Sequence, residues 1–195
     1  MSTRTAQRSR TRKAIVRAAA LLMERGERPS LDEIAAEAEV SRATAYRYFP
    51  GLDALLSEAA VEALVPEPEA IFAAAPGDVP ARLALVDETF DRVTRQGEVA
   101  LRMMLARILE RSATHGAGPE PLRQNRRTPM IERALEPLGE RLAPATRQRL
   151  THALAIVIGT ESFIALNDVV GLGEDEARGV RRWAIDALLA AALAA

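Results

Sequence analysis

A run of side chains between residues 41 and 49 combines the groups that proteins use to read nucleic acids. Its order is Ser-Arg-Ala-Thr-Ala-Tyr-Arg-Tyr-Phe. An arginine guanidinium donates two parallel hydrogen bonds to a guanine edge, and Thr and Tyr hydroxyls bond phosphate oxygens. A short side chain such as Ala43 lets a helix approach the bases closely. The run therefore predicts contact with a DNA groove, because an ordinary core helix more often has Leu or Ile inside and Glu or Lys outside.

Two short helices joined by a tight turn are predicted to position this run. Ser30 and Glu33 have the spacing of a capping box, which begins the first of these helices. Ser41 is a suitable N-cap for the second helix. Because only residues 39–40 separate them, we predict a helix-turn-helix. The side chains expected to face the core from the second helix are Ala45, Phe49 and part of Tyr46.

Positive charge is concentrated at the amino-terminal end of the chain. Residues 1–49 carry 10 basic and 6 acidic side chains, whereas residues 50–195 carry 16 and 21. All charges in the first 17 residues are positive, namely Arg4, Arg8, Arg10, Arg12, Lys13 and Arg17. A basic head on an acidic body is typical of a nucleic-acid module joined to another domain. We expect residues 1–10 to be a flexible basic arm that follows phosphates or enters a minor groove; the alternative is a passive solvated tail.

The segment from Ser30 to Leu56 resembles the helix-turn-helix of the TetR/AcrR family of bacterial transcriptional regulators. The matching positions are Ile34-Ala35-Ala36, Val40-Ser41, Thr44, Tyr46, Tyr48-Phe49 and Leu55-Leu56. The first helix and the chain length also fit. The resemblance implies an all-α homodimer with an N-terminal three-helix helix-turn-helix DNA-binding domain and a C-terminal helical effector-binding and dimerisation domain.

The resemblance also implies a role for each side chain of the run. Arg42 and Ala43 fall where base contacts are usual, and Arg47 falls at a variable position that reaches base or backbone. Phosphate contacts are implied for Thr44, Tyr46 and Tyr48, and Tyr46 is also in reach of a base. The predicted DNA-binding residues are Ser41, Arg42, Ala43, Thr44, Tyr46, Arg47 and Tyr48.

Two positions depart from the family's pattern. Glu39 stands in the turn where Gly is common. If its φ is positive, we expect a strain of about 1 kcal/mol there. Leu52 stands where a phosphate-binding Lys is common, which removes one expected backbone contact.

Helix-forming residues dominate the whole chain. It contains 38 Ala, and no run alternates between apolar and polar residues as a strand does. Helices are predicted at 11–25, 31–38, 41–49, 52–64, 80–95, 98–112, 127–139, 145–170 and 175–193. Prolines between 66 and 80 predict a linker, and 113–121 a long loop. The predicted organisation is an arm at 1–10, a helix-turn-helix domain at 11–64, and a ligand-binding and dimerisation domain at 65–195.

The chain lacks the residues that several classes of function require. The chain has no Cys, and its two His, 37 residues apart, form no HExxH pattern, so we expect no metal and no cofactor. Glu161 and Asp168 are a possible carboxylate pair for a helical enzyme, but no nucleophile elbow or phosphate loop accompanies them. We therefore expect no enzyme activity. No signal sequence or membrane-spanning run is visible, so a cytoplasmic location is expected.

The last two predicted helices are apolar on more than one face, which indicates burial on more than one side. We expect a homodimer interface at about 145–193, as the resemblance also implies. A two-fold dimer would present two recognition helices to the half-sites of a palindromic operator. A central core helix in a monomer is the alternative.

A binding pocket for an unidentified small molecule is predicted from composition alone. Its candidate lining residues are Phe90, Met103, Met104, Arg107, Ile108, Glu161 and Phe163. Each apolar member is also suited to ordinary core packing. Glu161 lies in an apolar run and needs a partner, for which Arg107, Arg126 and Arg127 are candidates, because an unpaired buried charge is costly.

The sequence as a whole predicts a ligand-responsive repressor of transcription. Its apo dimer would bind an operator, and a small molecule would favour a form with wrongly spaced recognition helices. The alternative is an effector-independent architectural DNA-binding protein. The long second region favours the first hypothesis, because dimerisation alone needs less chain.

Overall fold

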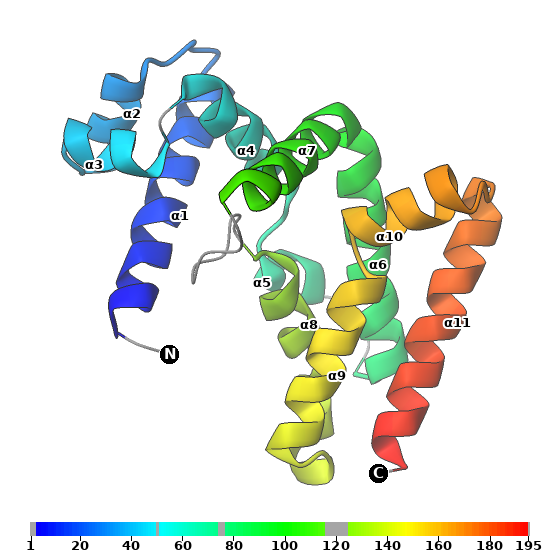
Figure 1. Ribbon diagram of the computed structural model, residues 1–195. Helices are drawn as coiled ribbons and strands as arrows, with labels where there is room; N and C mark the ends of the chain where they lie inside the picture. Colours follow the sequence, from blue (N-terminus) through cyan, green and yellow to red (C-terminus); the bar gives the residue numbers. More distant parts are fainter. Residues whose placement is uncertain (1–2, 50, 74–76, 116–124, 195) are drawn as a thin grey trace. The chain divides into compact units, whose positions relative to one another are not determined.

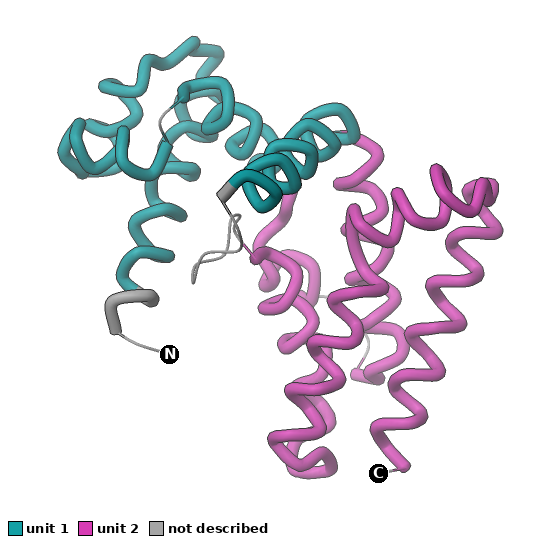
Figure 2. The backbone as a smooth tube through the Cα atoms, viewed as in Figure 1, with its two compact units in different colours: residues 1–64, 97–124 teal, residues 65–96, 125–195 magenta. Residues whose placement is uncertain are grey.

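Helices form all the regular secondary structure of the described part of the chain. The computed structural model describes residues 3–49, 51–73, 77–115 and 125–194 (Figure 1). The chain divides into two compact units, residues 1–64 with 97–124 and residues 65–96 with 125–195 (Figure 2). The predicted boundary after residue 64 coincides with a unit boundary. The segment 97–124, however, groups with the first unit, because its helix packs against the helix that ends at Leu64.

The first unit is built around the helix-turn-helix. Its helices are α1 (Thr3–Glu24), α2 (Leu31–Glu37), α3 (Arg42–Tyr48), α4 (Leu52–Leu64) and α7 (Glu98–His115). α1 packs along α4 and against α2, and α2 packs against α3 (Figure 1). The largest fully buried side chains of this core are Ile15, Val16, Ile34 and Leu55. They hold the two short helices on the longer α1 and α4, since helices this short are not stable alone.

α1 begins earlier than the sequence indicates. The predicted start is Thr11, after a flexible arm, but the helix runs from Thr3. The Thr11 hydroxyl donates to the carbonyl of Gln7 at 3.1 Å, inside the helix, and so does not cap a helix start. Arg10 Nη2 also donates to Gln7 Oε1, at 2.9 Å. Ala, Gln and Arg are good helix formers, so residues 3–10 continue the helix rather than form a flexible arm.

The second unit is a helical bundle with its own core. Its elements are α5 (Pro68–Phe72), α6 (Val79–Gln96), α8 (Arg127–Leu135), the 3₁₀ helix η1 (Glu136–Arg141), α9 (Pro144–Val157), α10 (Thr160–Ile164), the π-helix η2 (Ala165–Val169) and α11 (Glu174–Leu193). α9 lies beside α11, and α6 beside α8 (Figure 1). The largest fully buried side chains of this core are Leu83, Val86, Ile131, Leu135, Leu154, Ile158 and Ile185. The predicted linker 66–80 contains α5, and the predicted loop 113–121 lies, from residue 116 on, outside the described residues.

The single helix predicted at 145–170 is wrong, because it is interrupted at Gly159. This residue has φ 121° and ψ −167°, a conformation that side chains with a Cβ rarely adopt. α9 therefore ends at Val157 and α10 begins at Thr160. Arg127 Nη1 donates to the carbonyls of Ala155 and Ile158, at 2.7 and 2.8 Å. The carbonyls left free at the break thus have partners.

Candidate nucleic-acid interface

The predicted capping box at the start of α2 is confirmed. The Ser30 hydroxyl accepts from the Glu33 backbone N–H at 3.3 Å, and the Ser30 N–H donates to Glu33 Oε2 at 2.7 Å. The hydrogen bond from the Ser30 backbone, followed by that from its hydroxyl, lowers the pKa of Glu33 below its ordinary value of 4.5. A carboxylate at a helix N-terminus is also favoured by the helix dipole. Both effects fix where α2 begins.

The turn between α2 and α3 places Glu39 in the left-handed region, at φ 54°. The Val40 N–H donates to the Ala35 carbonyl and the Glu39 N–H to the Ala36 carbonyl, each at 3.0 Å. This is the hydrogen-bond pattern of a Schellman motif, which usually has Gly at the left-handed position. The departure of Glu39 from the family's pattern therefore does place a non-glycine residue at positive φ. Its strain, of order 1 kcal/mol, is offset by the bonds that end α2.

α3 separates its buried and exposed side chains as predicted. The Ser41 hydroxyl caps it by accepting from the Thr44 N–H at 3.1 Å. Ala45 and Phe49 are buried in the core of the first unit. The predicted DNA-binding side chains on the other faces are exposed at Ser41, Arg42, Ala43, Tyr46 and Arg47 and half-buried at Thr44 and Tyr48. Tyr46 is 43% exposed, so part of its surface is covered and part remains accessible.

Arg42, on α3, contacts two other side chains, one on α2 and one on α3. Its Nε lies 3.0 Å from Oδ1 of Asp32, on α2. Its Nη2 lies 3.5 Å from the Tyr46 hydroxyl, and its Cζ 5.3 Å from the centre of the Tyr46 ring. The hydrogen bond to Tyr46, and then the charge of Asp32, raise the pKa of Arg42 above its ordinary value. Sequence reasoning missed Asp32, because a pair between two helices has no signature in residue spacing.

A second arginine holds the end of α3 in place. The Arg12 guanidinium, on α1, lies 4.3 Å from the centre of the Phe49 ring and forms an ion pair with Glu58, on α4. The Glu58 side chain is almost fully buried. A cation over an aromatic face is attractive, and more so when it is shielded from water. The sequence identifies Arg12 only as part of the basic head. The sequence signal that could have indicated this role of Arg12 is Glu58, an acidic residue among the apolar residues of α4.

Other charges near the helix-turn-helix are distributed unevenly. Arg8 and Arg10 are exposed on α1, whereas the side chain of Arg4 lies outside the described ones. Arg47 extends beside Tyr48, with its Cζ 5.6 Å from the ring centre. Leu52 packs against the core of the first unit, so the start of α4 has an apolar side chain where the family's pattern has a lysine. Exposed cations near the start of α1 and on α3 include Arg8, Arg10, Arg42 and Arg47.

The predicted effector-lining residues are divided between the two units. Met103, Met104, Arg107 and Ile108 lie on α7, where Met103 and Arg107 are exposed, Met104 is buried and Ile108 is half-buried. In the second unit, Phe90 belongs to the core of the bundle. Phe163 is buried, with the Arg95 guanidinium carbon 5.4 Å from its ring centre. Glu161 pairs with Arg127, at 2.5 Å between Oε2 and Nη2, so one of the three predicted partners is confirmed.

The second unit also has a charged groove that the sequence did not indicate. It has a volume of about 500 Å³ and is lined by Asp87, Glu88, Asp91, Arg92, Arg95, Gln96, Arg178 and Arg181. None of the predicted effector residues lines it. Its members come from α6 and α11, which pack side by side. The groove is therefore a polar seam between two helices of the bundle.

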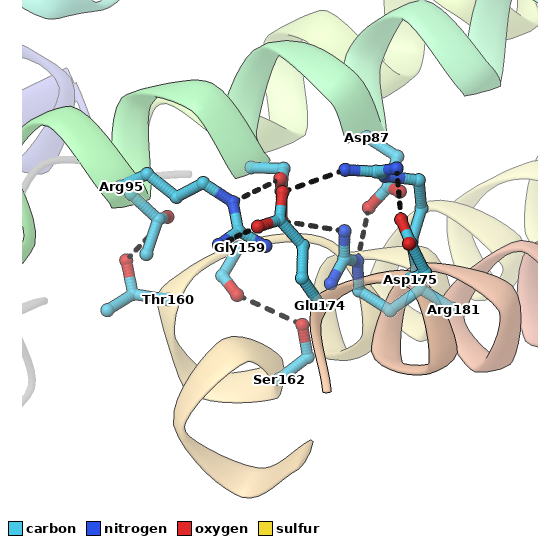
Figure 3. A network of polar contacts seen from close by, with 11 residues as sticks. Asp87, Arg95, Gly159, Thr160, Ser162, Glu174, Asp175 and Arg181 are labelled. Carbon is cyan, nitrogen blue, oxygen red and sulfur yellow. Dashed lines mark hydrogen bonds and ion pairs between the residues drawn. The ribbon is translucent and has the colours of Figure 1, made fainter. Parts of the chain in front are cut away.

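Arg181 is the centre of this seam (Figure 3). Its side chain is 3% exposed, and its Nε and Nη2 lie 2.9 Å from Asp87 and 2.7 Å from Asp91. Arg95 extends the network to Asp91 and Glu174, at 2.8 and 3.2 Å. Removing one partner of such a buried ion pair is strongly destabilising. These contacts therefore stabilise the packing of α11 against α6.

Asp87 lies at the buried end of the same network. Burial is the largest influence on this carboxyl and raises its pKa above the ordinary value of 3.8, while the hydrogen bond and charge of Arg181 oppose the rise. A carboxyl whose pKa is higher in the folded state favours folding most at low pH, and that contribution declines as the pH rises through the raised value. Arg181 therefore partly offsets the effect of burial on the Asp87 carboxyl.

Two further properties concern metals and membranes. Among the residues that the structure describes, no group of three or more His, Asp or Glu side chains is arranged to hold a metal ion. No single helix in those ranges is long and apolar enough to cross a membrane. The bent pair Pro144–Val157 and Thr160–Val169, with a 43° bend, meets that test jointly, by length and composition only.

Comparison with known proteins agrees with this geometry. Residues 14–59 match the model of a family described as bacterial regulatory proteins, tetR family. The fold is similar to that of a TetR transcriptional regulator from Rhodococcus sp. RHA1, with a TM-score of 0.50 and 20% sequence identity over 92% of this chain and 96% of that chain. No curated protein sequence matches the chain. The expected all-α fold is thus confirmed, and residues 14–59, which contain the helix-turn-helix, are similar to the corresponding segment of bacterial regulatory proteins of the tetR family.

Proposed function

We propose that the protein is a homodimeric, sequence-specific DNA-binding regulator that represses transcription at a palindromic operator and is released from it by a small molecule. The observation that carries the proposal is the division of α3 into two faces. Ala45 and the adjoining Phe49 are buried, whereas Arg42, Tyr46 and Arg47 are exposed. A helix anchored in this way presents hydrogen-bonding side chains to the major groove.

The proposed contacts follow the chemistry of each side chain. Arg42 donates to a guanine edge, and Ala43 permits close approach to the bases. Hydroxyls of Thr44, Tyr46 and Tyr48 donate to phosphate oxygens. Ser41 contributes from the start of the helix, and Arg47 reaches either bases or backbone. Arg8 and Arg10, exposed on α1, add phosphate contacts from a helical rather than a flexible segment.

Exposed apolar side chains of the second unit support the proposed homodimer. Trp183 on α11 is 73% exposed, and Ile156 on α9 is 75% exposed. Val169, Val170, Val180 and Leu193 are exposed as well. Tryptophan is enriched at the centres of protein interfaces, because its large surface gains much from burial. A second copy of the chain covering this face would pair the two units through about residues 145–193.

The proposed effector acts by shifting a conformational equilibrium. It needs only a different affinity for the DNA-binding and the released forms. The candidate residues for its binding stay those predicted from sequence, and Phe163 is the most informative to test. Its ring is buried beneath the Arg95 guanidinium, so a smaller side chain there would open space in the second unit.

The experiment that tests this function is a selection of random duplex DNA by the purified full-length protein at several salt concentrations. We expect enrichment of a palindrome whose half-sites are about one helical turn or more apart. Enrichment of a single half-site without symmetry would contradict the dimer. Binding without any sequence preference at every salt concentration would favour an architectural DNA-binding protein instead. The enriched duplex then serves as the probe in a screen for molecules that release it.

A further inference from the structure

Asp32, on α2, contacts the exposed guanidinium of Arg42, on α3. The distance from Oδ1 to Nε is 3.0 Å, with the Asp32 side chain 49% and the Arg42 side chain 69% exposed. Exposed ion pairs contribute little to folding stability. The main physical effect of this pair is therefore on the direction in which the guanidinium points.

We propose that Asp32 is a specificity-determining residue that positions Arg42 for base recognition. The inference rests on the proposed function of α3 as the base-reading helix. A guanidinium held at Nε leaves its opposite edge, formed by Nη1 and Nη2, for other acceptors. Two parallel donors on one edge match the O6 and N7 acceptors of guanine.

Tyr46 supports the Arg42 side chain from a second direction. It lies one helical turn after Arg42, with its hydroxyl 3.5 Å from Nη2 and its ring centre 5.3 Å from Cζ. Asp32 and Tyr46 come from different helices, so together they restrict rotation of the guanidinium. An arginine ordered before binding loses less conformational entropy when it meets the correct base.

The negative charge of Asp32 also affects how strongly the protein discriminates between DNA sequences. A carboxylate near the DNA-facing side of α3 repels phosphates and weakens binding to every sequence alike. An arginine released from Asp32 would be free to bond phosphates in many orientations, which carry no sequence information. Asp32 therefore lowers affinity for unrelated DNA while it favours the orientation that reads guanine.

The test compares full-length Asp32→Asn with wild type and with Glu37→Gln. Glu37 lies on the same helix but pairs with Arg25, at 3.2 Å, so its substitution changes the net charge equally and leaves Arg42 in place. The probes are the duplex enriched by wild type and the same duplex with its guanines replaced. We expect Asp32→Asn to bind unrelated DNA more tightly than wild type does. Its selectivity, the ratio of its affinities for the enriched duplex and for the duplex with replaced guanines, is expected to fall about two- to five-fold. Glu37→Gln keeps the wild-type selectivity.

A double substitution separates positioning from a general effect of charge. If Asp32 acts through Arg42, Asp32→Asn changes selectivity in wild type but not in an Arg42→Ala background. Melting curves of each variant check that the helix-turn-helix remains folded. Unchanged or increased selectivity of Asp32→Asn, or the same loss without Arg42, would overturn the inference and leave the proposed function intact. Wild type that enriches no sequence would overturn both.

Discussion

Arg127, on α8, and Glu161, on α10, form an ion pair beside the break between α9 and α10, with Nη2 of Arg127 2.5 Å from Oε2 of Glu161. Nη1 of the same guanidinium bonds the carbonyls of Ala155 and Ile158. One side chain therefore neutralises the carboxylate and satisfies carbonyls at the end of α9. Gly159 adjoins this guanidinium, because a Cβ built on it would lie 3.0 Å from Nη1.

The first prediction concerns the stability of this break. Gly159→Ala is expected to destabilise the fold by about 1–3 kcal/mol, because φ of 121° is unfavourable for Ala. The added Cβ would also press on Arg127. Urea unfolding at one fixed protein concentration measures the change. Gly77→Ala is the control, since nothing lies within 4 Å of its Cβ position. Equal stability of the two variants would contradict the strain at Gly159.

The second prediction concerns base reading by Arg42. Arg42→Ala is expected to reduce discrimination at one base pair by about 1–3 kcal/mol, because the bidentate pair of hydrogen bonds to guanine can no longer form. Competition binding to the enriched duplex and its single-base variants measures this reduction. The exposed position of Arg42 predicts an unchanged fold. Weaker binding with the same base preference would show that Arg42 bonds only the DNA backbone.

The third prediction concerns the basic side chains of α1. Replacing both Arg8 and Arg10 with Ala is expected to reduce the slope of log affinity against log salt by up to about 0.9 for each phosphate that is no longer neutralised. Fewer counterions are then released on binding. Arg133→Ala is the control, because Arg133 is exposed in the second unit and paired with Glu136. A salt slope equal to that of wild type would make this end of α1 a passive segment.

The fourth prediction concerns pH and the cap of α2. Folding lowers the pKa of Glu33, so its ionised form contributes stability above the unfolded value of 4.5. That contribution is lost as the pH falls through the lowered folded value. The difference in Tm between wild type and Glu33→Gln should therefore be largest near neutral pH and shrink in acid. A difference that is constant with pH would show that the carboxylate charge does not stabilise α2.

The fifth prediction concerns the dimer. Trp183→Ser is expected to weaken self-association by about 2 kcal/mol or more, as truncation of a central interface tryptophan does. Sedimentation velocity over a range of protein concentrations measures the change. Leu109→Ser is the matched control, because Leu109 is also exposed and apolar but lies on α7. Dimers of undiminished stability in Trp183→Ser would place the interface elsewhere.

The helix-turn-helix was predictable because its signals lie between near neighbours in the chain. Ser30 with Glu33, and Ser41 with Thr44, are each three residues apart, and such caps depend on local spacing alone. The start of α1 was placed wrongly because Thr11 resembles a cap in sequence, whereas its hydroxyl bonds the Gln7 carbonyl inside the helix.

Packing selects the partners of residues that lie far apart in the chain. Three arginines were candidate partners for Glu161, and only the packing of α8 against α9 selects Arg127. The pairs Asp32–Arg42 and Asp87–Arg181 have no sequence signal, because many oppositely charged residues could serve equally well as partners.

The break at Gly159, inside the predicted helix 145–170, could not be predicted from the sequence for a related reason. Gly within a helix costs only about 1 kcal/mol relative to Ala, so the presence of Gly159 alone does not end a helix. The guanidinium of Arg127, which bonds the carbonyls at the break, comes from a different helix. Local spacing thus specifies the recognition helix and its caps. Which charges meet, and where the long helix breaks, follow from distances between helices that spacing along the chain does not encode.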